Sequence, residues 1–416
     1  MVFAKYLLPA LAATQVAFAA KCEYPISIPP SPLRPTETDS FLTGGDTKIS
    51  SQSDADGIAT CSTIKGDITV DSDFSGALSL ASVEKIDGDL TVNNVTQLTS
   101  FSADSISEIT GTFKLTSLTT LSNLAFAKLA TVGSLEFSVL PALESLDFST
   151  GITKAGDVYI ADTKLGSLDG ITLDTVGAFD IENNRYLKTV NVNNLKNATG
   201  DITFAANYDA LQIELPNLGT GKNLTCRNIS SISVPSLKTL TGTLGFYGTD
   251  FKTFIAPNLT STGDLVFMNN KKLSNISMAA LTKVNGGFQI SRNDKLQEID
   301  LPKLEKVTGA IDFSGTFNTV EFGSLTEVAG GFNLQSTDGK FNCDTFNKMR
   351  GDVIRGTYKC VAKEDNPTTS SGKSGTSSSS SGSSSSSTSS GAAVANGASF
   401  GAAGVAAFFY AIAQLV

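Results

Sequence analysis

The chain has no histidine and no tryptophan among its 416 residues. Without histidine, a Ser-His-Asp triad, a Cys-His pair and a histidine-ligated metal site are all excluded. Basic residues are also outnumbered, with 31 Lys and Arg against 40 Asp and Glu, and the formal net charge of −9 argues against a nucleic-acid partner. A glycine-rich phosphate loop is missing too, because the recurring glycines precede strands rather than helices. We therefore expect no catalytic residue, no metal site and no cofactor.

What the sequence does have is an internal repeat of the form Gly-x-apolar-x-apolar, which recurs every 20 to 23 residues. Self-similarity at such a period is typical of a solenoid, in which each unit buries its apolar face against its neighbours. One unit has Lys222 in place of glycine. The other units begin at Gly66, Gly88, Gly111, Gly133, Gly156, Gly177, Gly200, Gly242, Gly263, Gly286, Gly309 and Gly330.

The apolar residues of each unit alternate or skip two positions, which favours short strands over helices. Glycine before each strand suits a bend with an unusual φ, and proline suits a corner where no N–H is needed. We predict an all-β, right-handed parallel β-solenoid of about thirteen coils. At about 4.8 Å per coil, such a rod is roughly 60 Å long. The corner prolines are Pro141, Pro216, Pro235, Pro257 and Pro302.

Asparagine recurs three or four residues before the leucine that opens the second half of a unit. Asparagine tolerates left-handed turns and bonds to neighbouring backbone, so the recurrence predicts a stacked ladder at one corner of the solenoid. A ligand-binding role is the alternative interpretation. The residues concerned are Asn94, Asn184, Asn207, Asn270 and Asn293.

The N-terminal residues are typical of a secretory signal peptide, predicted to span residues 1–19. Lys5 precedes a short apolar run, and Ala17 and Ala19 form a small-x-small cleavage motif. The alternative is a transmembrane anchor, which needs about 20 apolar residues, more than this run offers. After it we predict an N-terminal segment and cap over residues 20–60, repeats over 61–340 and a C-terminal cap over 341–362.

The C-terminal part predicts a stalk followed by a GPI-attachment signal. Residues 363–395 are rich in Ser and Thr, which suits a flexible or O-glycosylated stalk. Residues 396–416 combine small residues with an apolar end, the pattern of a GPI signal whose tail is removed. We assign the lipid to Asn396, and Ser390 or Gly391 also fit. A tail-anchored helix is the alternative, but the apolar run is short for a span.

The repeat region contains six Asn-x-Ser/Thr sequons, and in a secreted chain we expect several to carry N-glycans. For Asn223 the repeat register also predicts the direction of the side chain. Leu224 and Cys226 take inward slots, so Asn223 points outward. The sequons are at Asn94, Asn197, Asn223, Asn228, Asn258 and Asn275.

The five cysteines separate into one core residue and two pairs. Cys226 takes a core slot that phenylalanine fills in other units, so we interpret it as a buried free thiol. The other four flank the repeats, where an open-ended solenoid needs caps. In an oxidising compartment the economical pairings are Cys22–Cys61 and Cys343–Cys360. Residues 51–59 and 344–349 are predicted to add short capping helices.

Two outward features are candidate functional sites. The residue after the glycine is aspartate in five units, and neighbouring coils can bring two carboxylates to the spacing that a glycosidase needs. The column is patchy, so solubility and turn hydrogen bonds explain it better. Exposed tyrosines can stack on sugars or pack at corners. The aspartates are Asp67, Asp89, Asp157, Asp201 and Asp264, and the tyrosines are Tyr159, Tyr186, Tyr208 and Tyr247.

Taken together, the cap over residues 51–70, the Gly-x-Leu-x-Phe coils, the Cys343 and Cys360 end, the serine tract and the GPI signal resemble a known family. This family is the fungal GPI-anchored cell-wall organisation proteins, which include sporulation-specific members and carry receptor-L-domain-like repeats. The resemblance implies a β-solenoid of leucine-rich-repeat or receptor-L-domain type.

The resemblance also implies a function: a non-enzymatic surface glycoprotein required for cell-wall organisation, assembly and integrity. It would be held at the outer leaflet of the plasma membrane through GPI, within the wall network of glucan and mannoprotein. A receptor-like binding module for a wall polysaccharide or protein is the first alternative. A wall-remodelling glycosidase is the second.

Overall fold

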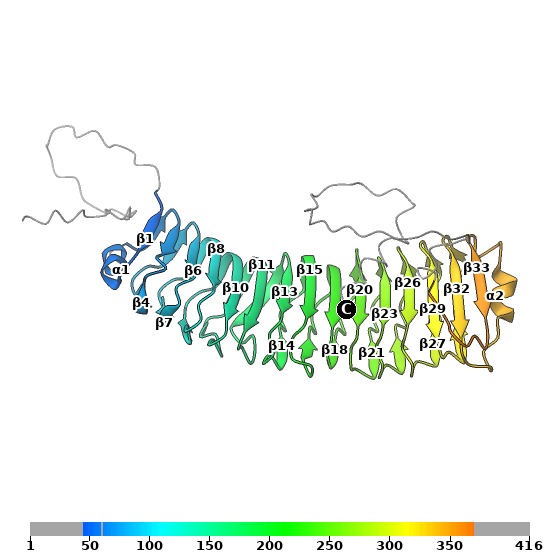
Figure 1. The fold of residues 1–416 in the computed structure, drawn as a ribbon. Coiled ribbons are helices and arrows are strands. Elements are labelled where there is room, and N and C mark those ends of the chain that lie inside the picture. The colour runs from blue at the N-terminus through cyan, green and yellow to red at the C-terminus, as the bar shows by residue number, and fades with distance from the viewer. Residues whose placement is uncertain (1–44, 60, 370–416) are drawn as a thin grey trace, which may run out of the picture.

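The computed structural model describes residues 45–59 and 61–369, which form a long parallel β-solenoid. Figure 1 shows its strands stacked into a rod, with a short helix, α1 (Gln52–Ile58), at one end and α2 (Asp344–Met349) at the other. The strand pairings are parallel, and the rod makes about fourteen turns. The prediction of an all-β parallel solenoid with about thirteen coils is therefore confirmed.

Most coils contribute strands to three ladders. Ladder 1 contains the strands that follow the repeat glycines. Strands used only in ladder 1 are β1 (Thr47–Ile49), β3 (Ile68–Val70), β6 (Leu90–Asn93), β13 (Phe179–Glu182), β20 (Leu244–Tyr247), β23 (Leu265–Met268), β26 (Phe288–Ser291), β29 (Ile311–Gly315), β32 (Phe332–Ser336) and β33 (Tyr358–Val361).

Ladder 2 contains the strands of the second half of each unit. They are β4 (Ser75–Ser79), β7 (Gln97–Ser102), β9 (Asn123–Ala125), β14 (Thr189–Asn191), β16 (Gln212–Glu214), β18 (Ser231–Ser233), β21 (Thr253–Ile255), β24 (Asn275–Ser277), β27 (Glu298–Asp300) and β30 (Thr319–Glu321).

Ladder 3 contains the strands that precede the glycines. They are β2 (Thr63–Lys65), β5 (Lys85–Asp87), β12 (Ile171–Val176), β19 (Thr239–Leu240), β22 (Ser261–Thr262), β25 (Lys283–Val284), β28 (Lys306–Val307) and β31 (Glu327–Val328). In some coils one long strand passes through the glycine and joins ladder 3 to ladder 1. These strands are β8 (Glu108–Thr116), β10 (Thr131–Leu140), β11 (Ile152–Thr163), β15 (Asn197–Ala205) and β17 (Thr220–Arg227).

The core is a continuous apolar column inside the three ladders. In ladder 1 the inward residues pair in register from coil to coil, so that Phe246 lies opposite Phe267 and Phe313 opposite Leu334. Phenylalanine rings also meet across the ladders, as between Phe246 and Phe254, whose ring centroids are 4.6 Å apart. The period-2 alternation of each short strand thus delivers one apolar side to a shared interior.

The repeat glycines are needed for close packing between coils rather than for an unusual φ. In the repeat series from Gly66 to Gly330, Gly66 is the one glycine with a positive φ. The Gly111 N–H instead donates a 3.0 Å hydrogen bond to the carbonyl oxygen of Gly88. A Cβ at Gly111 would lie 2.7 Å from that oxygen, which is too close for any side chain. The bend explanation is therefore wrong for most of these glycines.

The same close contact extends the repeat beyond the units identified from the sequence. A Cβ at Gly66 would lie 2.9 Å from the carbonyl oxygen of Gly45, and a Cβ at Gly356 would lie 2.3 Å from that of Gly330. β1 and β33 follow these two additional glycines and pair with β3 and β32. Ladder 1 therefore has one more strand at each end.

A second repeated backbone feature lies six residues after the repeat glycine, where φ is positive and the chain turns a corner. Most coils place a residue with a side chain there, against the usual preference for glycine. The residues in this left-handed column are Asn94, Ser117, Val139, Asp162, Asn183, Ala206, Asn228, Asn269 and Arg292, with φ between 52° and 60°.

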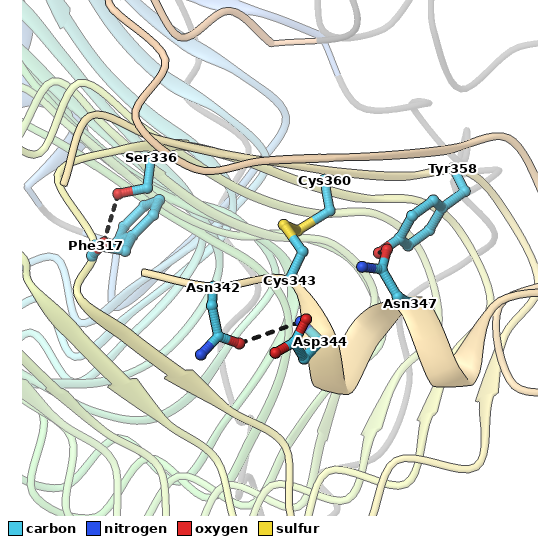
Figure 2. Close-up of a disulfide and its surroundings, with 8 residues drawn as sticks. All are labelled: Phe317, Ser336, Asn342, Cys343, Asp344, Asn347, Tyr358 and Cys360. Atoms are coloured by element: carbon cyan, nitrogen blue, oxygen red, sulfur yellow. Dashed lines mark hydrogen bonds between the residues drawn. A yellow bond between two sulfur atoms is a disulfide. The ribbon is translucent and has the colours of Figure 1, made fainter. Parts of the chain in front are cut away.

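Both predicted capping helices are present. Ser51 caps α1, and its side chain and that of Asp54 form a reciprocal capping box. At the other end Phe346 of α2 is buried, with its ring 5.1 Å from that of Phe332. Figure 2 shows the Cys343–Cys360 disulfide tying the start of α2 to β33. Each end of the apolar column is thus covered.

Candidate functional site

The aspartate column joins each coil to the next. Asp89 Oδ1 accepts a 2.6 Å hydrogen bond from the backbone N–H of Thr112, and Asp67 Oδ1 accepts one of 2.8 Å from the N–H of Asp89. Asp157 and Asp264 bond in the same way to the following coil. These carboxylates satisfy the backbone donors beside the glycines, so they bond to the next coil rather than within a turn.

The asparagine ladder is buried at one corner, seven residues after the repeat glycine. Asn184 Oδ1 accepts from the N–H and hydroxyl of Thr163, at 3.1 and 2.6 Å. The N–H of Asn270 donates to Asn293 Oδ1 at 2.8 Å. The predicted asparagine ladder is confirmed for Asn184, Asn207, Asn270 and Asn293. It is wrong for Asn94, which lies one position earlier, in the exposed left-handed column.

Three of the described cysteines have clear structural positions. Cys343 and Cys360 form a disulfide, and Cys360 lies on β33 opposite Leu334. Cys226 is a free thiol in the core, paired in register with Phe204 and Phe246. Burial raises the pKa of this thiol far above its ordinary value, so it is unsuited to nucleophilic chemistry.

Cys61 is buried beside α1. Its predicted partner, Cys22, lies outside the described residues, so that pairing stays a prediction. The signal peptide, the part of the stalk beyond residue 369 and the attachment residue Asn396, with the alternatives Ser390 and Gly391, also lie outside the described residues.

The sequons divide into exposed and half-buried positions. Asn94, Asn228, Asn258 and Asn275 are exposed, on corners or on ladder 2. Asn197 is half-buried, and its side-chain oxygen accepts a hydrogen bond from the Thr220 hydroxyl. Occupancy of all six sequons stays a prediction.

Asn223 belongs to the column that joins the coils. As predicted from its register, its side chain is directed away from the core, but it is half-buried. Its Nδ2 donates to Asp201 Oδ1 at 2.8 Å, and its Oδ1 accepts from the backbone N–H of Thr243 at 2.5 Å. Asn223 therefore does in its coil what aspartate does in others.

The outward side of ladder 1 forms a regular surface, on which Asn223 is the one sequon among the described residues. We call it the outer face and define it by the residue three positions after each repeat glycine. Its side chains range from exposed or half-buried in the first coils to buried in the last. The residues are Thr69, Thr91, Lys114, Glu136, Tyr159, Asp180, Thr203, Thr225, Gly245, Val266, Gln289, Asp312 and Asn333.

The tyrosines proposed as exposed are not all available for stacking. Tyr159 is 38 % exposed on the outer face, and Tyr186 and Tyr208 are exposed at corners. Tyr247 is only 6 % exposed, so its assignment as exposed is wrong. The guanidinium of Arg227 lies 4.4 Å from the centroid of its ring, which covers one side of the aromatic system.

Beside Tyr159 the outer face carries an acidic pair, Asp180 and Glu182 on β13. Burial raises the pKa of Asp180, and the nearby carboxylates of Asp201 and Asp157 act in the same direction. Burial also raises the pKa of Glu182, to which Asp180 adds. One oxygen of Asp180 is buried without a hydrogen-bond partner. The ionised forms of these two carboxylates are therefore disfavoured at this position of the surface.

Two kinds of site are absent from the described part of the chain. No group of three or more Cys, Asp or Glu side chains there is arranged to hold a metal ion. Among residues 45–59 and 61–369 no helix has the length and apolar content needed to cross a membrane.

Sequence reasoning missed the amides of the last coils and the chain segment that they bind. Asn333 Nδ2 and Gln335 Nε2 both donate to the carbonyl oxygen of Thr368, at 2.9 and 2.6 Å. The repeat register was the available signal, because it places both amides on the outer side of β32.

Comparisons with known proteins agree with these features. Residues 1–28 match a family model described as GPI-anchored cell wall organization protein, and residues 210–319 match a BspA-type leucine-rich repeat region in six copies. The chain is 54% identical to "Protein ecm33" of Aspergillus fumigatus, over 90% of each chain. It is 37% identical to "Cell surface GPI-anchored protein" of Arthroderma benhamiae, over 90% of this chain and 92% of the relative.

A more distant relative is "Sporulation-specific protein 22" of Saccharomyces cerevisiae, 32% identical over 74% of this chain and 68% of the relative. No solved structure matches the chain significantly. The identity of 54% over 90% of the chain shows the family. The chain belongs to the family of GPI-anchored cell wall organization proteins.

Proposed function

We propose that this chain is a non-enzymatic, GPI-anchored cell-surface glycoprotein required for the organisation, assembly and integrity of the fungal cell wall. The observation that carries the proposal is how its recurring polar residues are used. Asp89, Asp157 and Asn184 bond to the next coil, so the repeated columns build a stiff rod rather than a reaction centre. The names of its relatives, "Protein ecm33" and "Cell surface GPI-anchored protein", support the same function.

The proposed location is the outer face of the plasma membrane, the cell wall, or both. Attachment runs through GPI at Asn396, and the proposed partners are the lipid outer leaflet and the wall network of glucan and mannoprotein. Glycans at exposed sequons, such as Asn94 and Asn258, suit a surface that faces this network. No nucleic-acid partner is proposed, given the net charge of −9.

Enzymatic release from intact cells tests the location. A phospholipase specific for GPI should free the full chain from the membrane, and a glucanase should free any portion transferred to the wall. An Asn396→Leu variant should lose the phospholipase-released form if Asn396 carries the lipid. Chain that neither enzyme releases would contradict an anchored surface protein.

Complementation tests the role in the wall. In cells that lack the gene, the full chain should restore resistance to wall-perturbing dyes, and a chain that ends at residue 395 should be secreted without restoring it. A catalytic function would be indicated by soluble product from labelled β-glucan, chitin or mannan. Such product would replace the non-enzymatic proposal with a glycosidase.

A second candidate function is a receptor-like binding module for a wall polysaccharide or protein. It is favoured by the outer face, which exposes Tyr159 between polar neighbours and whose one sequon, Asn223, is half-buried. Saturable retention of the chain on one polysaccharide, lost in Tyr159→Ala and kept in the corner control Tyr186→Ala, would support it. Equal retention of both variants would remove the outer face from consideration.

A further inference from the structure

Four neighbouring coils carry a concentration of negative charge on the outward side of ladder 1. Each strand there directs outward the residues one, three and five positions after its repeat glycine. From β10 to β15 these positions, all among the described residues, hold five carboxylates and no Lys or Arg. A surface of one charge sign attracts ligands of the opposite sign. We call it the acidic patch, and its members are Glu136, Asp157, Asp180, Glu182 and Asp201.

Tyr159 lies in the middle of the acidic patch. At the same repeat position its strand neighbours are Glu136 on β10 and Asp180 on β13. Among the described coils Tyr159 is the one aromatic residue of the outer face, and it is 38 % exposed. Burial raises the pKa of its hydroxyl, and four surrounding carboxylates add to the rise. Tyr159 therefore offers a ring for stacking inside a field of negative charge.

Two carboxylates of the acidic patch lack the partners that the other three have. Glu136 and Asp201 each pair with a lysine, at 2.7 and 3.1 Å, and Asp157 accepts a backbone N–H at 2.6 Å. Within the described chain neither Asp180 nor Glu182 forms an ion pair, and Asp180 Oδ1 accepts no hydrogen bond. Burial raises the pKa of both carboxyl groups. A cation bound beside them would stabilise their ionised forms.

We propose that the acidic patch and Tyr159 form a docking surface for a cationic amino-sugar polymer, a chain of β-1,4-linked glucosamine, which is the deacetylated form of chitin. This inference rests on the second candidate function, a receptor-like module for a wall polysaccharide, and names its ligand class. One sugar ring stacks on Tyr159. The protonated amine of the neighbouring sugar donates to the carboxylates of Asp180 and Glu182, one coil farther along the rod.

Charge and spacing select this ligand over two others. Neighbouring coils are about 4.8 Å apart, close to the length of one sugar unit in an extended β-1,4-linked chain, so a chain along the rod places one unit over each coil. An extended basic peptide presents side chains on one face roughly every 6.6 Å and falls out of step with the coils. A neutral glucan matches the spacing but brings no cation to Asp180 and Glu182.

Binding of two matched oligomers to the full chain, purified in detergent, tests the ligand class. The probes are a β-1,4-linked glucosamine oligomer and its N-acetylated counterpart of equal length, at about pH 6, above the ordinary pKa range of carboxylates. Acetylation removes the charge and keeps the sugar ring. The glucosamine oligomer should bind saturably and at least about tenfold more tightly, with an affinity that falls as salt rises. Equal affinity for the two oligomers would overturn the proposal.

A pair of matched double variants tests the place of binding. Asp180→Asn with Glu182→Gln should weaken binding of the glucosamine oligomer at least about tenfold, because both open carboxylates are lost. The control is Glu298→Gln with Asp300→Asn on β27, which removes two exposed carboxylates at the same spacing from ladder 2. The control should stay within about twofold of the original chain. Equal weakening in both variants would show a response to net charge alone and would overturn the acidic patch.

Tyr159→Ala tests the sugar against a basic peptide. It should weaken binding of the glucosamine oligomer about fivefold, through loss of stacking, and leave binding of polylysine unchanged. An unchanged affinity for the sugar oligomer would mean that the surface binds cations of any kind, and would overturn the assignment to an amino sugar.

A measurement on the unaltered chain needs no variant. Saturating glucosamine oligomer should raise its urea midpoint, because a ligand that binds only the folded rod stabilises it, and the N-acetylated oligomer should not. Failure here is distinguishable from failure of the proposed wall function. A chain that restores resistance to wall-perturbing dyes but binds neither oligomer would overturn this inference and leave the wall function standing.

Discussion

The backbone N–H of Asn184 donates a 3.0 Å hydrogen bond to the side-chain oxygen of Asn207 in the next coil. Asn207 Nδ2 in turn donates to the carbonyl oxygen of Ile181 at 2.7 Å. Both asparagines are buried, so each side chain satisfies backbone groups that water cannot reach. In the coils that carry these asparagines, the corner is thereby fixed to its neighbour by side chains, in addition to the strand ladders.

Asn207→Ala should therefore destabilise the rod strongly. The change leaves the N–H of Asn184 buried without its acceptor and removes the donor to Ile181, and each loss costs about 1–3 kcal/mol. We expect a total of about 3 kcal/mol by urea unfolding. The control is Asn217→Ala, because Asn217 is exposed while making a similar bond to a backbone carbonyl. A loss no greater than that of the control would show that the buried ladder is not stabilising.

Val139→Asn should stabilise the chain. Val139 has φ of 56° and is exposed, so a β-branched residue adopts a left-handed conformation without burying its side chain. Asn94, Asn183 and Asn269 take the same position in other coils at lower strain. We expect a gain of about 1 kcal/mol in the free energy of unfolding. Val139→Ile keeps the branching and should give no gain, and an equal gain from both would rule out strain as the cause.

Gly111→Ala tests the close contact between coils. The added Cβ would lie 2.1 Å from Asp89 Oδ1 and 2.7 Å from the carbonyl oxygen of Gly88, and that oxygen cannot move without shifting its strand. We expect a loss of about 3 kcal/mol, at the upper end for overpacking. At Gly166 an added Cβ meets nothing within 4 Å. Gly166→Ala should therefore stay within about 0.5 kcal/mol of the original chain.

Asp180→Asn should stabilise the chain at neutral pH and lose that effect in acid. Because the pKa of Asp180 is raised in the folded state, the folded chain binds more protons than the unfolded chain just above the ordinary value of 3.8. Stability therefore falls as pH rises through this window, and the ionised carboxylate opposes folding at neutral pH. Urea midpoints of variant and original chain should differ most near pH 7 and converge below about pH 4. A difference independent of pH would contradict this explanation.

The same sequence pattern predicted some features and concealed others. The period placed Cys226 in the core column between Phe204 and Phe246, because inward slots depend only on register. It did not reveal why glycine recurs, since contact between coils depends on neighbours about 22 residues away. Asn94 and Asn184 differ by one repeat position, and this single step separates an exposed left-handed corner from a buried ladder.

The outer face was the least predictable part. Outward positions vary in sequence, so Tyr247 gave no sign that Arg227 would cover its ring. The unit at Gly45 has Thr47 where the pattern expects an apolar residue, which hid the first strand of ladder 1. The contact of Thr368 with β32 was hidden for a related reason: the amides of Asn333 and Gln335 could be placed by register, but the backbone groups of Thr368 that they bind carry no residue signal.

Glycosylation should distinguish Asn223 from the exposed sequons. A glycan on its Nδ2 replaces one of that nitrogen's hydrogens and brings bulk to a half-buried position between Asp201 and Thr243. Asn94 and Asn228 lie on open corners and have no such conflict. Glycopeptide mass spectrometry of the secreted chain should therefore find Asn94 and Asn228 occupied and Asn223 largely unmodified. Full occupancy at Asn223 would contradict this prediction, because it would mean that the coil forms without the Asn223–Asp201 bond. In that case Asn223→Asp, which keeps an acceptor for the Thr243 N–H, should be secreted as well as Asn94→Asp.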